Sequence, residues 1–98
     1  MLKIVYPICC GIDVHKTFVI ATIATTDHEN ITTYQTKRFS TFTRDLKALA
    51  AWLSEHQCVD VCMESTGKYW IPVRNVLEPS CQITLAHPKY VRAIRGKK

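Results

Sequence analysis

The strongest constraint on the fold is a change of hydrophobic period part-way along the chain. Three segments rich in β-branched residues, Ile8–Val14, Thr17–Thr25 and Ile31–Phe39, follow one another with short polar links. Such a succession predicts three strands in an antiparallel meander. From Thr43 onward the apolar residues recur every three or four positions, which predicts a helix that ends near residues 56–57. A threonine at its start, Thr41 or Thr43, is the expected N-cap.

Strand and helix patterns alternate after this first helix. Cys58–Met63 has the pattern of a short apolar strand that ends at Glu64, Tyr69–Leu77 that of a helix, and Gln82–Ala86 that of a fifth strand. Pro88 then opens a last helical stretch, so the predicted order is β-β-β-α-β-α-β-(α). A meander followed by strands delivered through helical crossovers predicts an α/β domain with a mixed sheet covered by helices. An RNase H-like fold has this order, and few other small folds share it.

Length and composition bound the class of protein. The chain has 98 residues, which suits one small domain with one modest core. Its apolar fraction of 47% and charged fraction of 21% exclude a disordered or low-complexity chain. No uncharged apolar run approaches the roughly 18 residues that a membrane span needs, and the apolar N-terminal stretch lacks the cleavage site of a signal peptide. We therefore expect a single cytoplasmic domain over residues 1–98, with no membrane partner.

Five cysteines are present, and their spacing fits no common metal or disulfide motif. Two are adjacent and two others are four residues apart, so neither a C-x-x-C pair nor a zinc knuckle is formed. All have β-branched or apolar neighbours, which favours small buried hydrophobic side chains in a reducing compartment. The five are Cys9, Cys10, Cys58, Cys62 and Cys81.

Two acids are distinguished by their position in the predicted sheet. Asp13 lies at the end of the first strand, and Glu64 closes the fourth. In an RNase H-like sheet these two strands are neighbours, so we expect the two carboxylates to meet at one edge. Magnesium takes oxygen ligands, commonly one or two protein carboxylates together with substrate phosphates, and a pair of such ions can promote phosphodiester cleavage. The alternative is that each acid merely marks the end of a strand.

Residues beside these acids have two possible roles each. Lys16 and Lys68 closely follow the two acids and either contact nucleic-acid phosphate or offset the carboxylate charge. His15 is either a partly exposed turn residue or a group that orients phosphate or water. Tyr69 and Trp70 could stack on bases, although their helical spacing favours core packing for at least one of them.

The net charge of +5 is confined to one end of the chain. Residues 1–78 contain eight Lys and Arg and all eight Asp and Glu, so they are neutral. The excess lies in a C-terminal stretch without acids, and it predicts contact with a polyanion rather than only a solvated face. If its cations contact phosphates, affinity should fall with salt by roughly 0.9 log units per contact per decade. The cations are Lys89, Arg92, Arg95, Lys97 and Lys98.

Three motifs together resemble one protein family. They are Gly11–Lys16 (GIDVHK), Met63–Trp70 (MESTGKYW) and the stretch from His87 to Lys98 (HPKYVRAIRGKK). In this order they resemble the N-terminal domain of insertion-sequence-110 family transposases. The resemblance implies a RuvC-like, RNase H-fold domain in which four acids, the DEDD set, bind Mg²⁺ (or Mn²⁺). Asp13 then matches the first acid and Glu64 the second.

The same resemblance implies partners and a departure from the family pattern. Family members recombine DNA through junction-like intermediates, guided by a structured RNA, and we expect a homo-oligomer for the complete protein. Their remaining two aspartates, in a D-x-x-D arrangement, and a C-terminal domain with a catalytic serine come after the basic stretch. This sequence contains neither, so the resemblance predicts a C-terminally truncated domain that holds Mg²⁺ weakly and is inactive in recombination by itself.

Three functional hypotheses follow. The first is a transposase domain in which Asp13 and Glu64 are catalytic metal ligands for DNA strand cleavage and exchange. The second is an inactive nucleic-acid-binding module that uses the basic residues. The third is an ATPase of the sugar-kinase type, whose first strand also carries Gly-Ile-Asp. It is disfavoured because Val14–Lys16 lacks the glycine and hydroxyl residues of a phosphate-binding turn.

Overall fold

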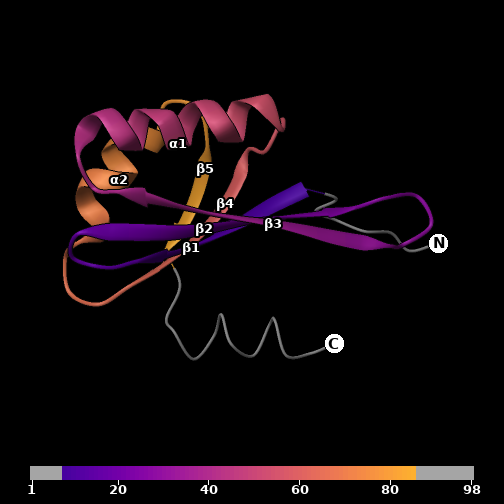
Figure 1. The fold of residues 1–98 in the computed structure, drawn as a ribbon, viewed down its shortest axis with the longest axis horizontal. Coiled ribbons are helices and arrows are strands. Elements are labelled where there is room, and N and C mark those ends of the chain that lie inside the picture. Colours follow the sequence, from indigo (N-terminus) through magenta and orange to yellow (C-terminus); the bar gives the residue numbers. More distant parts are fainter. Residues whose placement is uncertain (1–7, 86–98) are drawn as a thin grey trace.

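The computed structural model describes residues 8–85, which form one mixed β-sheet with two helices on one of its faces (Figure 1). The observed order is three strands, a helix, a strand, a helix and a strand, as the sequence predicts. The elements are β1 (Ile8–Val14), β2 (Phe18–Thr26), β3 (Thr32–Ser40), α1 (Thr43–Glu55), β4 (Asp60–Ser65), α2 (Trp70–Leu77) and β5 (Gln82–Leu85).

The sheet has the strand order β3-β2-β1-β4-β5. The meander pairs β1 with β2 and β2 with β3 in antiparallel fashion, whereas β4 and β5 are added in parallel through helical crossovers. The β2–β3 turn is closed by the Asp27 carboxylate, which accepts hydrogen bonds from the backbone N–H groups of Glu29 (2.8 Å) and Ile31 (3.0 Å). Asn30 completes the turn with φ of 64°, a conformation that asparagine tolerates better than most residues. The expected RNase H-like mixed sheet is confirmed.

The start of α1 differs from the sequence prediction. Phe42, rather than Thr41 or Thr43, occupies the N-cap position, and its side chain makes no capping bond. The Ser40 hydroxyl instead accepts from the Phe42 backbone N–H at 3.2 Å and donates to the Asp45 carboxylate. The last residue of β3 therefore organises the first turn of the helix, a role that local sequence preference does not reveal.

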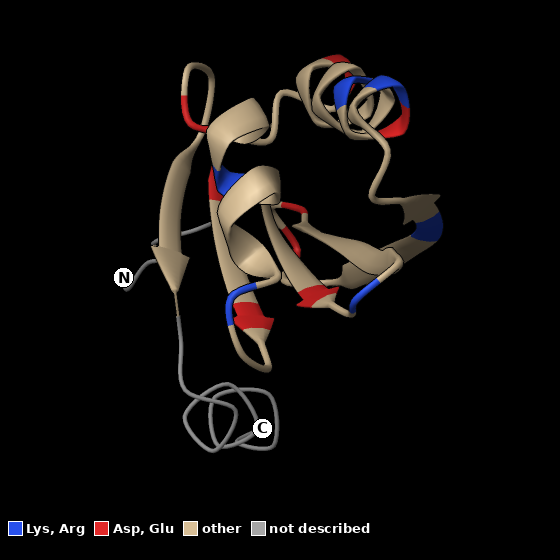
Figure 2. Cartoon of the chain, turned by 90° about the vertical axis from the view of Figure 1, so that its left-hand side faces the viewer, with Lys and Arg blue, Asp and Glu red and all other residues tan. Residues whose placement is uncertain are grey.

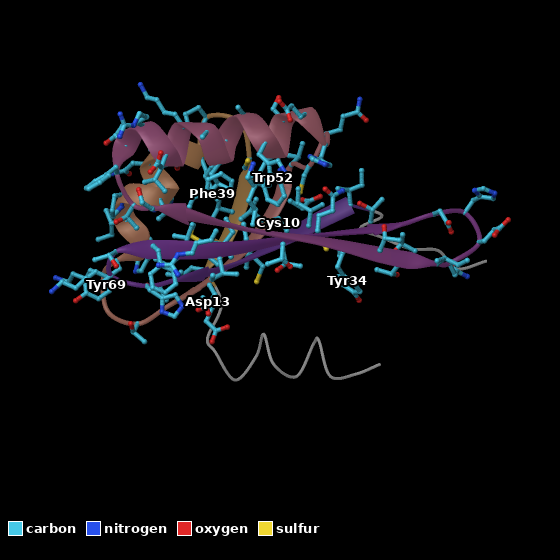
Figure 3. The ribbon with its side chains drawn as sticks, in the orientation of Figure 1. Cys10, Asp13, Tyr34, Phe39, Trp52 and Tyr69 are labelled. Atoms are coloured by element: carbon cyan, nitrogen blue, oxygen red, sulfur yellow. The ribbon has the colours of Figure 1, made fainter. Side chains whose placement is uncertain are left out.

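The core lies between the helices and one face of the sheet. Alternate residues of the central strands point into it, as a period of two requires, and α1 and α2 cover them with apolar residues three or four positions apart. In Figure 3, Cys10, Phe39 and Trp52 lie between sheet and helix, whereas Asp13 and Tyr34 lie on the opposite face. We call that opposite face the open face. The buried set is Cys10, Ile12, Val14, Val19, Ala21, Ile23, Phe39, Leu46, Leu49, Leu53, Cys58, Val61, Met63, Val73 and Leu77.

Two boundaries bear on function. Strand β4 begins at Asp60 and runs through Ser65, so Glu64 lies within the strand rather than at its last position. The predicted C-terminal helical stretch and its five cations fall outside the described residues. Between Ile8 and Leu85, neither helix has the length and apolar character needed to cross a membrane.

Candidate metal centre on the open face

Asp13 and Glu64 are direct register partners in the parallel pairing of β1 with β4. The residues next to them along the strands, Ile12, Val14 and Met63, are buried against the helices. Because successive residues of a strand point to opposite faces, both acids lie on the open face. Adjacent strands lie about 4.8 Å apart, so the two carboxylates belong to one small site. The backbone pairing confirms the expectation that these two acids meet.

His15 holds the Asp13 carboxylate from the turn that follows β1. Its Nε2 donates to Asp13 Oδ2 at 3.0 Å, and its side chain is 43% exposed against 55% for Asp13. The His15 ring stacks on Phe18 with centroids 4.4 Å apart, and its backbone N–H donates to the Phe18 carbonyl at 2.9 Å. His15 is therefore both a half-exposed turn residue and a fixed neighbour of Asp13.

The two acids line a shallow pocket of about 140 Å³. Gly11 forms part of its lining beside Thr22 of β2. A Cβ atom at Gly11 would meet no atom within 4 Å, so this glycine is needed neither for packing nor for a turn. Its effect is to leave the pocket open. From the sequence Gly11 was given no role, although a glycine inside a strand is a known signal of close approach by a ligand.

The pair of carboxylates fits part of a divalent-cation site. Oxygen ligands are those that Mg²⁺ prefers, and two protein carboxylates completed by water and phosphate are a common set. Within residues 8–85, however, no three His, Cys, Asp or Glu side chains are grouped so that they could hold a metal ion. The described part of the chain thus offers two ligands and leaves the remaining positions to other groups.

Burial raises the pKa of four of the five thiols. Burial raises the pKa of Cys10, and burial, reinforced by neighbouring Cys9 and Cys81, raises that of Cys58 to about 12. A thiol must ionise to become a good metal ligand. All five were expected to be buried, and Cys10 and Cys58 are, whereas Cys9, Cys62 and Cys81 are half-buried. Burial raises the pKa of Cys9 and Cys81 as well.

The predicted basic and aromatic residues near the acids are placed as follows. Lys16 lies in the β1–β2 turn and Lys68 in the β4–α2 turn, both exposed and neither in an ion pair with any acid of residues 8–85. Figure 2 shows acidic positions at the ends of two neighbouring strands, each followed by a basic position in the next turn. Trp70 packs against the core, whereas Tyr69 is 41% exposed. The cations of residues 89–98 lie outside the described part.

Comparison with known proteins gives the family. A sequence profile of the DEDD transposases of the insertion-sequence-110 group matches residues 10–98. The chain belongs to this transposase family. No curated protein sequence matches it significantly.

Solved structures similar to this transposase domain support the RuvC-like fold. RuvC of Thermus thermophilus superposes with a TM-score of 0.62 at 14% identity, over 88% of this chain and 67% of that one. A fowlpox virus resolvase, solved with Holliday junction DNA, gives 0.58 at 13% identity over 92% and 74%. A PPX-GPPA enzyme of Aquifex aeolicus gives 0.59 at 12% identity, but only 36% of its length is covered. At these identities the likeness is one of fold.

Proposed function

We propose that this transposase-family domain binds DNA and contributes Asp13 and Glu64 as catalytic metal ligands for strand cleavage and exchange. The observation that carries the proposal is the direct register pairing of the two acids on the open face. The family match and the RuvC-like fold support it. DNA as the partner is supported by the family, and a structured guide RNA and a homo-oligomer of the complete protein are parts of the same proposal.

Each residue of the site has a separate role in this proposal. A bound Mg²⁺ (or Mn²⁺) would stabilise the charge on the attacking and leaving oxygens of the phosphodiester. Asp13 and Glu64 would hold the ion, and the His15 hydrogen bond fixes one oxygen of Asp13 so that the carboxylate keeps one orientation. Gly11 leaves room for a phosphate to approach. Lys16 and Lys68, in the turns after the two strands, contact flanking phosphates.

Two acids are half of the DEDD set. We infer that residues 1–98 form a RuvC-like transposase domain in which Asp13 and Glu64 are the first two acids of this set. Two carboxylates hold a divalent ion weakly. The chain by itself is then expected to bind DNA without recombining it.

Metal binding at the acid pair is tested by Mn²⁺ titration followed by NMR. Because Mn²⁺ broadens nearby resonances, the amide signals of Asp13 and Glu64 should be lost first, together with those of Gly11 and Thr22 in the pocket lining. Asp13→Asn should abolish this local broadening. Asp60→Asn is the matched control, since Asp60 also lies on β4 but four residues before Glu64, about 13 Å away along an extended strand.

Two results would overturn the metal assignment. One is local broadening that survives Asp13→Asn, and the other is equal loss in both variants. In a complete family member, the substitution that matches Asp13→Asn should abolish strand exchange without unfolding the protein.

An inactive DNA-binding module is the second candidate function. It is favoured by one observation, namely that within residues 8–85 no three metal-ligating side chains are grouped so that they could hold an ion. This alternative predicts DNA binding that depends on salt and is unchanged by Mg²⁺, by Asp13→Asn and by Glu64→Gln. The transposase-site proposal instead predicts tighter DNA binding when Mg²⁺ is added, because an ion held by the acids removes their repulsion of phosphate.

A further inference from the structure

A single row of residues crosses the open face from the edge of the sheet to the acid pair. Strand pairing places Arg38 of β3 opposite Ile20 of β2, Ile20 opposite Asp13 of β1, and Asp13 opposite Glu64 of β4. Paired residues point to the same face, so Arg38 shares the open face with both acids. Two strand spacings separate Arg38 from Asp13, which is about 10 Å.

Contacts hold the Arg38 side chain in place. Its guanidinium carbon lies 3.9 Å from the centroid of the Phe18 ring. The same ring stacks on His15, which is bonded to Asp13. A chain of contacts therefore runs from Arg38 to the candidate metal ligand, and it reduces the rotamer freedom that a binding side chain would otherwise lose.

Arg38 places a positive charge on a sheet whose described strands contain few basic residues. The strands of the described sheet contain two basic residues, Lys37 and Arg38. The Lys37 ammonium group lies over Phe39 and Trp52, on the helix-covered side. Arg38 is thus the one strand cation on the open face within residues 8–85, and it forms no ion pair with an acid of that range.

We propose that Arg38 binds a backbone phosphate of the DNA strand whose neighbouring phosphate lies at the Asp13–Glu64 pair. The inference rests on the proposed function and adds the direction of the bound strand, from the acid pair across β2 towards β3. A guanidinium held over an aromatic ring keeps N–H donors at its rim, and these match the oxygens of a phosphate. Beside this path, in the neighbouring row opposite Gly11, Thr22 and Thr36 present a polar surface, with their hydroxyls 3.1 Å apart.

The test compares two neighbouring residues of equal charge. Binding of a fluorescein-labelled four-way DNA junction to the 98-residue chain is measured by anisotropy in Mg²⁺ over a range of salt concentrations. Arg38→Gln should weaken binding about tenfold, the size expected for one charge-assisted hydrogen-bonded contact. It should also lower the slope of log K against log salt by about 0.9. Lys37→Gln removes the same charge from the other face and should leave both quantities unchanged.

Other results separate the possible failures. Arg38→Lys keeps the charge but loses the planar donor set, so it should restore the salt slope and only part of the affinity. Equal effects of Arg38→Gln and Lys37→Gln, or no effect of Arg38→Gln, would overturn the role of Arg38. The proposed function would survive either of these results if the Mn²⁺ broadening still depends on Asp13. Absence of junction binding by the unsubstituted chain would overturn both proposals. Thermal unfolding of each variant checks that the fold is retained.

Discussion

Gly11→Ala should stabilise the domain and weaken its ligand binding at the same time. A glycine within a strand costs roughly 0.5–1 kcal/mol relative to alanine, because it loses more backbone freedom on folding. The added methyl group meets no atom within 4 Å, so no packing penalty offsets this gain. For a domain of this size, 1 kcal/mol corresponds to about 4–8 °C in Tm. We therefore expect a rise in Tm of roughly 2–8 °C.

The same methyl group projects into the pocket beside the acid pair. If a phosphate approaches the sheet at Gly11, the methyl group opposes it, and overpacking of this kind costs about 1 kcal/mol or more. That cost corresponds to at least about a fivefold loss of affinity for DNA in Mg²⁺. Thermal unfolding followed by circular dichroism and anisotropy with the labelled junction measure the two quantities.

Gly67→Ala provides the control, because Gly67, unlike Gly11, adopts a backbone conformation that favours glycine. Gly67 has φ of 61°, a left-handed conformation that costs an L-residue roughly 1–2 kcal/mol. Its replacement should lower the Tm, whereas that of Gly11 should raise it. A lower Tm for Gly11→Ala would refute the reasoning about open space at Gly11. Unchanged junction affinity in a stabilised Gly11→Ala variant would refute the role of Gly11 in ligand approach.

Two further predictions concern the core. Leu53→Ala, which truncates a fully buried side chain of α1, should lower the free energy of unfolding by about 2–5 kcal/mol in urea titrations; a loss below 1 kcal/mol would contradict this packing. The Cys58 thiol has a folded pKa of about 12 against 9.0 for the free group, so the unfolded state loses its proton first as pH rises. Its contribution to stability should be complete below pH 9 and decline between pH 9 and 12. Urea unfolding at pH 8 and pH 10.5 should show a smaller decline for Cys58→Ala than for the unsubstituted chain.

The sequence predicted the element order and the meeting of Asp13 with Glu64, because both follow from periodicity and topology. Ile8–Val14 is a nearly continuous apolar run with Asp13 near its end, which predicts a buried central strand, and a crossover through a helix requires the fourth strand to run parallel to its partner. It did not predict the N-cap of α1, since Ser40 contacts Asp45 only after the end of β3 has been placed next to the helix. Nor could it separate Tyr69 from Trp70, because helical spacing alone does not say which aromatic side chain the core covers.

The sequence by itself determined the order of the elements, the identity of the two acids and the family. Each of these follows from a local pattern. The element order follows from periods of two or of three to four residues, the two acids from their place at the end of an apolar run, and the family from three short motifs in a fixed order. Only the tertiary structure decided that Arg38 lies in the same row as these acids, that Phe18 and His15 link it to Asp13, and that Gly11 leaves their pocket open. Those relations depend on strand register, which is set by the pairing of segments far apart in the sequence and by the burial of one face of the sheet.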